Sequence, residues 1–169
     1  MTEKDQKEQF IEVLEKNIGI VLKISGIYAR TAQDREDLVN DITLELWRSF
    51  GRFRGDSKIS TWIYRVALNV SMNFSRKRNN DRLYFPSDLT KIEVQGGITD
   101  AADSTPSDIL YQCIDELDQF NRAIILLYLD GNSHDEISVI TGISKTNVGT
   151  RLSRIREQIR KIAVTKNSK

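Results

Sequence analysis

The spacing of apolar residues constrains the fold of this chain more than any other feature. Apolar side chains recur at intervals of three and four residues up to about residue 80 and again after residue 105, and the pattern disappears in between. Such intervals place side chains on one face of an α-helix. The stretch in between has a proline, paired glycines and scattered Asp and Ser, and it cannot form a core. The pattern predicts an all-α protein with two small helical domains joined by a flexible linker: residues 1–82, the linker 83–105, and residues 106–169.

The first predicted domain contains three amphipathic helices. One apolar stripe extends over about residues 10–29, and Asp34 is the predicted N-cap of a second helix that ends at Phe50. A turn with a glycine follows at residues 54–57, and a third stripe begins at Ile59 and runs into a basic segment. We expect these helices to share one modest core.

The second predicted domain opens with a helix start signal. Thr105 is placed to cap a helix, Pro106 takes its first position, and Asp108 follows three residues after the cap. Two apolar stripes then extend over residues 109–117 and 124–129, and the second ends at an Asp-Gly pair. Two more helices complete the domain.

These last two helices have the features of a helix-turn-helix. Residues 133–136 form a capping box that opens a short helix, and Ser144 is placed to cap a longer one. Gly142 lies in the turn between them, where the backbone commonly takes a positive φ. In DNA-binding motifs of this kind the second helix enters the major groove. The motif therefore predicts DNA binding.

The second helix of this motif has one apolar and one polar face. Its apolar residues, which begin at Val148, are expected to point inward. The residues left on the outer face are Asn147, Thr150, Arg151 and Arg154. Arginine can bond guanine and asparagine can bond adenine, so these four could meet base edges. The residues expected to contact phosphate lie further along the helix: Arg156, Arg160 and Lys161.

Two segments of the chain are strongly basic although the formal net charge is only +1. Residues 47–82 contain nine Lys or Arg and two acids, and residues 145–169 contain eight Lys or Arg and one acid. Separate basic surfaces are suited to neutralising phosphates. We expect two contacts along one polyanion. The alternative is a pair of solvated helix faces.

The residue types exclude several kinds of chemistry. Cys113 and His134 are the only residues of their kinds, so a disulfide framework is excluded and a zinc site lacks ligands. We expect no metal and no cofactor. The acids are spread over helix faces rather than clustered, so an enzyme acting on nucleic acid is not expected. No apolar run could span a bilayer and the N-terminal residues are polar, which predicts a cytoplasmic protein without membrane insertion.

Three segments resemble, in order, the working parts of the extracytoplasmic-function (group IV) sigma factors of the bacterial sigma-70 family. Residues 53–69 (FRGDSKISTWIYRVALN) closely resemble the promoter-melting segment of that family. Residues 37–41 (DLVND) with Trp47 resemble its polymerase-binding helix, and residues 121–154 resemble the module that reads the upstream promoter element. Three linked matches over nearly the whole chain are more specific than any single one.

The resemblance first implies a contact with core RNA polymerase. In that family the second helix docks on the coiled coil of the β′ subunit, and the C-terminal module contacts the β flap. Carried onto this chain, the polymerase-binding residues are Asp37, Leu38, Asn40, Asp41, Leu44 and Trp47. The carboxylates are the better candidates for contacts, because packing in the core would equally account for the tryptophan.

The resemblance also implies two contacts with promoter DNA. Family members flip a base of the minus-10 element into a pocket beside the third helix, and stacking or hydrogen bonds must compensate the cost. The residues implied at the minus-10 element are Arg54, Ser57, Lys58, Thr61, Arg65, Asn69, Arg76, Lys77 and Arg78. Those implied at the minus-35 element are Asn147, Gly149, Thr150, Arg151, Ser153, Arg154 and Arg156. Trp62 lies near the first set, and we expect it to be buried.

Three residues depart from the family pattern. Gly149 replaces a basic residue, so one contact with DNA should be missing and the preferred sequence should differ. Ser138 and Thr141 stand where alanine and leucine are common, and we expect them to weaken the core slightly. The family commonly has anti-sigma proteins, so the resemblance also implies such a partner. The alternative is a stand-alone helix-turn-helix transcriptional regulator, which would leave the first domain unexplained.

Overall fold

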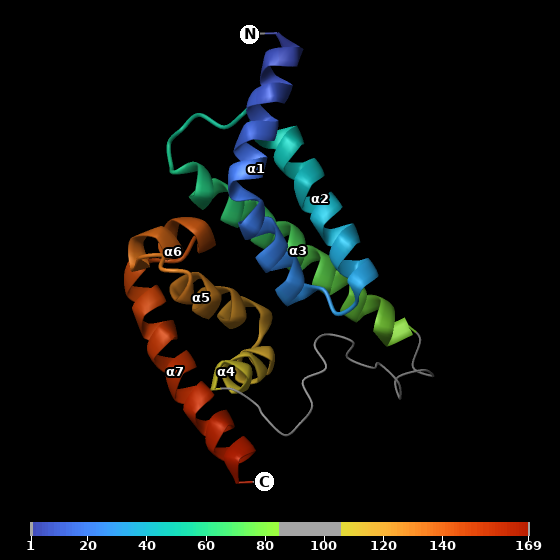
Figure 1. The fold of residues 1–169 in the computed structure, drawn as a ribbon. Coiled ribbons are helices and arrows are strands. Elements are labelled where there is room, and N and C mark those ends of the chain that lie inside the picture. The colour runs from blue at the N-terminus through green and yellow to red at the C-terminus, as the bar shows by residue number, and fades with distance from the viewer. Residues whose placement is uncertain (1, 85–105, 169) are drawn as a thin grey trace. The chain divides into compact units, whose positions relative to one another are not determined.

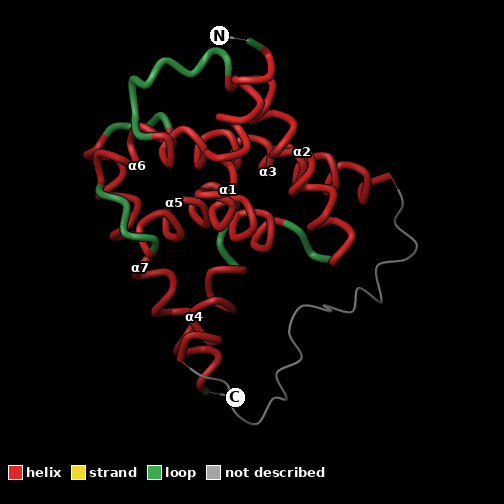
Figure 2. Tube along the Cα trace, turned by 45° about the horizontal axis from the view of Figure 1, so that its top comes forward, coloured by secondary structure: helices red, strands yellow, loops and turns green. Residues whose placement is uncertain are grey.

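The computed structural model describes residues 2–84 and 106–168. Within these two ranges every regular element is an α-helix, and there are seven of them (Figure 1 and Figure 2). The chain divides into two compact units, Met1–Gly97 and Ile98–Lys169. The prediction of an all-α protein with two helical domains is therefore confirmed. The first two residues of the predicted linker, 83 and 84, are helical, and the rest lies outside the described residues, so the bounds of the linker stay a prediction.

The first unit is a bundle of three helices. They are α1 (Glu3–Tyr28), α2 (Ala32–Phe50) and α3 (Ile59–Tyr84), and each packs against the other two (Figure 1). The fully buried residues include Val21, Leu38, Ile42, Leu46 and Ile63. These residues belong to the three predicted apolar stripes. Burial of one face of each helix is thus what holds the unit together.

Helix α1 begins earlier than its apolar stripe predicts. The Thr2 hydroxyl accepts a hydrogen bond from the Asp5 amide at 3.3 Å, and the Asp5 carboxylate accepts one from the Thr2 amide at 3.0 Å. This capping box satisfies two amides that a helix N-terminus leaves without partners. The Lys, Glu and Gln residues that follow are good helix formers. The first two turns are therefore helical although they lack an apolar face.

The prediction that Asp34 caps α2 was wrong. Thr31 is the N-cap, because its backbone is extended and its hydroxyl accepts from the Asp34 amide at 3.0 Å. Asp34 lies inside the first turn and is largely buried. Its carboxylate accepts a hydrogen bond from the guanidinium of Arg78, near the far end of α3. A contact with another helix thus gives Asp34 a role that its own neighbourhood does not reveal.

The second unit has four helices. They are α4 (Pro106–Asp115), α5 (Gln119–Leu129), α6 (His134–Thr141) and α7 (Lys145–Asn167). Its fully buried residues include Ile114, Ile124, Leu127, Ile137, Leu152 and Ile155. Helix α7 packs against each of the other three, so it is the element around which the unit is built.

The predicted helix-turn-helix is present at α6 and α7. The Ser133 hydroxyl accepts from the Glu136 amide at 3.1 Å, and the Glu136 carboxylate accepts from the Ser133 amide at 2.8 Å. Gly142 has φ +80°, a left-handed conformation that glycine adopts without strain. Ser144 caps α7 by accepting from the Asn147 amide at 3.1 Å. The predictions for both caps and for the turn are confirmed.

Ser138 and Thr141 do not leave polar groups without partners in this motif. The Ser138 hydroxyl donates to the carbonyl of Ile143 at 2.5 Å, and the Thr141 hydroxyl donates to the carbonyl of Ile137 at 2.6 Å. A buried hydroxyl is costly mainly when it lacks a hydrogen bond. Both hydroxyls therefore have acceptors, and the bond from Ser138 ties α6 to the turn; the expected weakening of the core stays a prediction.

Asp34→Ala should lower the free energy of unfolding of the first unit by about 1 to 3 kcal/mol, because it removes the partner of Arg78 and a negative charge near the N-terminus of α2. Trp47 and Trp62 are the only tryptophans and both lie in this unit. Urea unfolding followed by tryptophan fluorescence therefore measures this unit. The exposed Asp37 is the control, and Asp37→Ala should change the value by no more than about 0.5 kcal/mol. Equal effects would contradict a role for the ion pair.

Candidate nucleic-acid interface and protein-binding groove

The exposed face of α2 carries four of the six residues that the resemblance implies in polymerase binding. They are Asp37, Asn40, Asp41 and Leu44, and their spacing of three and four residues places them in one stripe. Leu38 is fully buried in the core with Ile42 and Leu46. It points to the other side of the helix, so it cannot touch a partner while the unit is folded.

A groove of about 650 Å³ lies between α1 and α2, beside this stripe. Its lining is largely apolar and includes Ile11 and Leu44, which are 42% and 46% exposed. Trp47 also lines the groove, and its ring packs edge-on against the ring of Phe10 with 5.2 Å between centroids. Trp47 is half-buried. It therefore supports the core and also contributes to the accessible groove.

Aromatic packing anchors the loop that leads from α2 into α3. The rings of Phe53 and Trp62 lie 5.1 Å apart between centroids, and those of Trp62 and Phe50 lie 6.3 Å apart. Gly55, at φ +77°, makes the turn in this loop. Trp62 is half-buried rather than fully buried, so part of its surface stays accessible beside the loop.

Most residues implied at the minus-10 element are accessible. The exposed ones are Arg54, Lys58, Arg65, Asn69, Arg76, Lys77 and Arg78, and Ser57 is half-buried. On α3, Arg65, Asn69 and Arg76 recur at helical intervals and share one face. Thr61 lies one turn before Arg65 in the same row, but it is buried. This row of α3 is therefore exposed, polar and basic from Arg65 onward, and it begins with a buried threonine.

Arg78 differs from the two basic residues that precede it. Its guanidinium donates to the Asp34 carboxylate and lies over the ring of Phe74, 5.4 Å from the centroid. Arg76 and Lys77 are exposed and contribute to the basic surface. All three residues are exposed, and the structure distinguishes Arg78 by its contacts, which hold α3 to α2.

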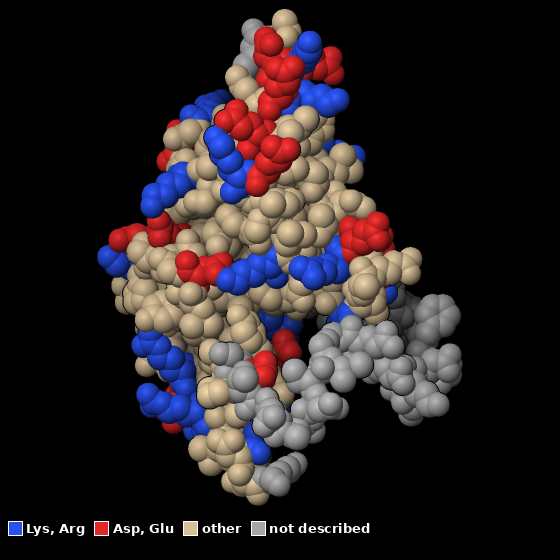
Figure 3. Space-filling view, in the orientation of Figure 1, with Lys and Arg blue, Asp and Glu red and all other residues tan. Residues whose placement is uncertain are grey.

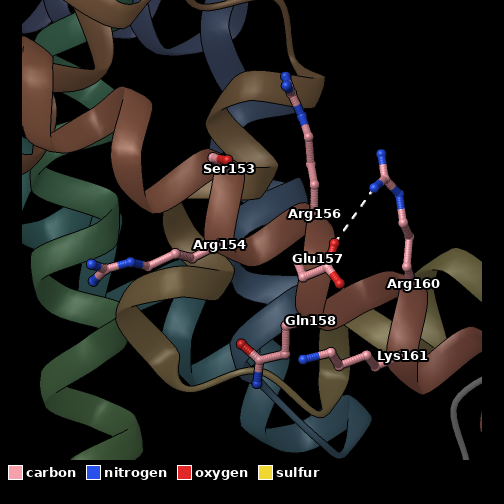
Figure 4. A pocket seen from close by; sticks show the side chains of 7 residues that line it. All are labelled: Ser153, Arg154, Arg156, Glu157, Gln158, Arg160 and Lys161. Carbon is pink, nitrogen blue, oxygen red and sulfur yellow. Dashed lines mark hydrogen bonds and ion pairs between the residues drawn. The ribbon is translucent and has the colours of Figure 1, made fainter.

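The outer surface of α7 has two lines of residues. Asn147, Arg151 and Arg154 follow one line, at intervals of four and three residues. Gly149, Ser153 and Arg156 follow the other at the same intervals, and helical geometry places Thr150 between the two lines. Arg154 and Arg156 leave the helix in different directions (Figure 4).

Arg151 is not free on the outer face, in contrast to what the sequence predicts. It is half-buried, donates to the side-chain oxygen of Asn121 at 3.1 Å, and lies over the ring of Phe120 at 5.0 Å. Asn121 in turn donates to the carboxylate of Asp118, the N-cap of α5, at 2.7 Å. These contacts tie α7, the recognition helix of the helix-turn-helix, to the start of α5. Arg151 therefore positions α7 within the fold.

An open hollow of about 600 Å³ lies along the exposed side of α7. Ser153, Arg154 and Arg156 line it together with Arg160 and Lys161, and Arg160 donates to Glu157 at 3.5 Å (Figure 4). Lys and Arg side chains gather along this helix on the molecular surface (Figure 3). A concave basic surface next to a helix-turn-helix is suited to a phosphate backbone.

Two further observations concern residues 2–84 and 106–168. No group of three or more His, Cys, Asp or Glu side chains in these ranges could hold a metal ion. No helix in them is both long enough and apolar enough to cross a membrane.

The chain matches two family models, one in each unit. The model described as Sigma-70 region 2 matches residues 13–80, and the model described as Sigma-70, region 4 matches residues 107–159. The ECF RNA polymerase sigma-E factor of Escherichia coli K12 is 30% identical over 153 residues, which cover 81% of this chain and 78% of that protein. This chain belongs to the extracytoplasmic-function sigma factors. It recognises promoters for RNA polymerase.

One further relative is similar to this sigma factor in sequence, and two solved structures are similar to it in fold. The RNA polymerase sigma-H factor of Pseudomonas aeruginosa is 25% identical over 160 residues, 86% of this chain and 79% of the relative. The sigma factor RpoE from Bartonella quintana, solved with the anti-sigma factor NepR, has a TM-score of 0.66 at 22% identity and covers 94% of this chain and 96% of its own. CnrH, solved with the cytosolic domain of CnrY, has a TM-score of 0.67 at 19% identity, with 94% and 90% covered. A stand-alone regulator finds no support.

Sequence reasoning missed three features of these surfaces in the sigma factor. Ile11 contributes to the groove, and its position beside the stripe that begins at Phe10 was an available signal for a second apolar surface. The partners of Arg78 and Arg151 are distant in sequence, and nothing local identifies them. The minus-10 and minus-35 residues therefore include two arginines that are engaged within the fold.

Gly149→Ala should raise the free energy of unfolding of the second unit by about 0.5 to 1 kcal/mol, because glycine within a helix is less favourable than alanine. A Cβ here would lie 3.8 Å from the imidazole of His134, an ordinary contact. Gly142→Ala is the matched opposite and should cost about 1 kcal/mol, because its φ is +80°. Thermal unfolding followed by circular dichroism measures both, with tryptophan fluorescence of the first unit unchanged. A loss in both variants would show that position 149 does not tolerate a side chain.

Proposed function

We propose that the two units divide the work of this sigma factor between RNA polymerase and two promoter elements. Residues 1–82 act as region 2, which binds the β′ coiled coil and the minus-10 element. Residues 106–169 act as region 4, which binds the minus-35 element and the β flap, and residues 83–105 link them. The observation that carries this proposal is that each family model covers one compact unit, and each unit exposes its own basic helix face.

The groove between α1 and α2 is the proposed docking site for the β′ coiled coil. Protein interfaces combine an apolar centre with a polar rim. Leu44 and Ile11 supply accessible apolar surface at the groove, and Asp37 and Asp41 supply negative charge beside it. The half-buried Trp47 supports the floor through its contact with Phe10. Leu38 acts only through the core.

The loop before α3 and the exposed strip of α3 form the proposed minus-10 surface. Flipping a base out of the stack costs a few kcal/mol, and this cost must be offset by stacking or by hydrogen bonds to the base. The accessible part of Trp62 lies beside this loop, and Arg65 and Asn69 offer a guanidinium and an amide on α3. Arg76 and Lys77 continue the strip and are suited to duplex phosphates.

The outer face of α7 is the proposed minus-35 surface. Asn147, Thr150, Ser153 and Arg154 are exposed and can reach base edges. Arg156 serves as a phosphate contact, and Arg151 contributes by holding the helix in place. Gly149 has no side chain to offer, so the preferred sequence should differ from that of relatives with a basic residue there.

A protein partner that blocks these surfaces is a further part of the proposal. Two proteins of similar structure were solved with a partner: the sigma factor RpoE with the anti-sigma factor NepR, and CnrH with the cytosolic domain of CnrY. The same groove and basic faces that serve transcription are the exposed surfaces that such an anti-sigma protein would cover.

Leu44→Lys should weaken binding to core polymerase about tenfold or more, because it places a charge where apolar surface is buried on docking. Leu22→Lys is the matched control, since Leu22 is an exposed leucine of α1 outside the groove. Run-off transcription with purified core polymerase on a promoter pool gives the functional reading. The wild-type chain should confer selective start sites, and failure to do so would overturn the proposed function. Equal losses for both leucine variants would overturn the docking site.

Arg154→Ala should lower affinity for a selected promoter by about 1 to 3 kcal/mol if the side chain reads a base. The loss should disappear on a duplex whose minus-35 element has been substituted. Arg151→Ala is the contrasting variant, because it should lower the thermal stability of the second unit, whereas Arg154→Ala should not. A uniform loss for Arg154→Ala on all sequences, with a smaller salt dependence, would reassign Arg154 to phosphate.

A further inference from the structure

One line of the α7 surface faces a cluster formed by the end of α5 and the start of α6. Arg156 lies over the ring of Tyr128, with 4.8 Å from the guanidinium carbon to the centroid. The rings of Tyr128 and His134 lie 6.3 Å apart. Gly149, two turns before Arg156, faces the imidazole, because a Cβ at that position would lie 3.8 Å from it. Three helices thus bring Arg156, Tyr128, His134 and Gly149 together along one flank of the recognition helix.

Arg156 is oriented by this cluster, but its hydrogen-bond donors remain available. Its side chain is exposed, and among the described residues it makes no hydrogen bond or ion pair. Arg151 on the other flank also lies over an aromatic ring, but it is half-buried and donates to Asn121. A guanidinium that stacks by its face keeps its N–H edge free for an acceptor. Phosphate oxygens are acceptors that match this edge.

Gly149 leaves the imidazole of His134 uncovered on the same flank. A longer side chain at position 149 would extend over His134, whereas glycine leaves that space open. His134 is half-buried, so part of the ring is accessible. An imidazole N–H is also a donor for phosphate. The flank therefore offers two donors of different residue types around one tyrosine ring.

We infer that Tyr128 is a positioning residue that holds Arg156 for a backbone phosphate at the edge of the minus-35 element, and that His134 supplies the neighbouring contact that Gly149 lacks. The inference rests on the proposed role of α7 in binding this element. A side chain that is already ordered loses less rotamer freedom on binding, so its contact is stronger. Phosphates are the same in every sequence, so the contact adds affinity without base selection.

The experiment measures binding of the holoenzyme, made from the full chain and core polymerase, to two duplexes. One is a promoter selected by run-off transcription, and the other has the same sequence with its minus-35 element scrambled. Affinities are measured over a salt series for Arg156→Ala, Tyr128→Leu and Tyr128→Phe. Tyr111→Leu is the control, because Tyr111 is an exposed tyrosine of α4 outside the cluster.

Arg156→Ala should reduce the slope of log affinity against log salt by about 0.9, the value for one lost phosphate contact. Tyr128→Leu removes no charge, and it should still weaken binding about two- to tenfold on both duplexes. Tyr128→Phe keeps the ring and should remain within about twofold of the wild type, as should Tyr111→Leu. Combining Tyr128→Leu with Arg156→Ala should cost no more than Arg156→Ala alone, because the tyrosine acts through the arginine.

His134→Ala should weaken binding to both duplexes by a similar factor, and no loss would overturn the part assigned to His134.

If Tyr128→Leu lowers the affinity as much in the Arg156→Ala background as in the wild type, Tyr128 acts only on the fold and the inference fails. A loss restricted to the selected promoter would also overturn it. If Tyr128→Leu does not fold, Arg156→Lys decides: it keeps the charge and the salt slope but should lose affinity, because lysine does not stack as arginine does. Equal wild-type affinity for both duplexes would instead refute the minus-35 function.

Discussion

Each helix in these small units buries one face, and this constraint determines where function can lie. A bundle of three or four helices has a single core, so the opposite face of each helix remains in solvent. In α2 the buried line contains Leu38 and the exposed line contains Asp37 and Leu44. In α7 the buried line begins at Val148, and the exposed lines carry the arginines. The same helices therefore build the core and form the binding surfaces.

The arginines show how packing divides residues that look alike in the sequence. Arg78 pairs with Asp34, Arg151 bonds Asn121, and Arg156 stacks on Tyr128 while its donors stay available. The first two stabilise contacts between helices through their donors, whereas the third is ordered by an aromatic ring and keeps its donors for another acceptor. A basic segment is thus a mixture of structural and binding residues, and its net charge overstates the number of phosphates it can neutralise.

The division into two units suits a protein that must recognise two separate elements of one DNA molecule. Each unit alone presents a small surface, and small surfaces bind weakly. Joining two modules in one chain makes the second contact effectively intramolecular, so overall affinity rises without new contacts. Shared docking on polymerase would strengthen this effect.

The sequence by itself determined the helices, the two domains, the caps at Ser133 and Ser144 and the turn at Gly142, because these features depend on residues only a few positions apart. The sequence also identified the family, because each motif that resembles the family is a contiguous segment of the chain. Only the tertiary structure decided that Leu38 is buried, that the groove of Leu44 is accessible, and which arginines are engaged. Those outcomes depend on pairs such as Asp34 with Arg78 and Asn121 with Arg151, which are 44 and 30 residues apart. No local pattern encodes such pairs, because they exist only once apolar burial has brought separate helices together.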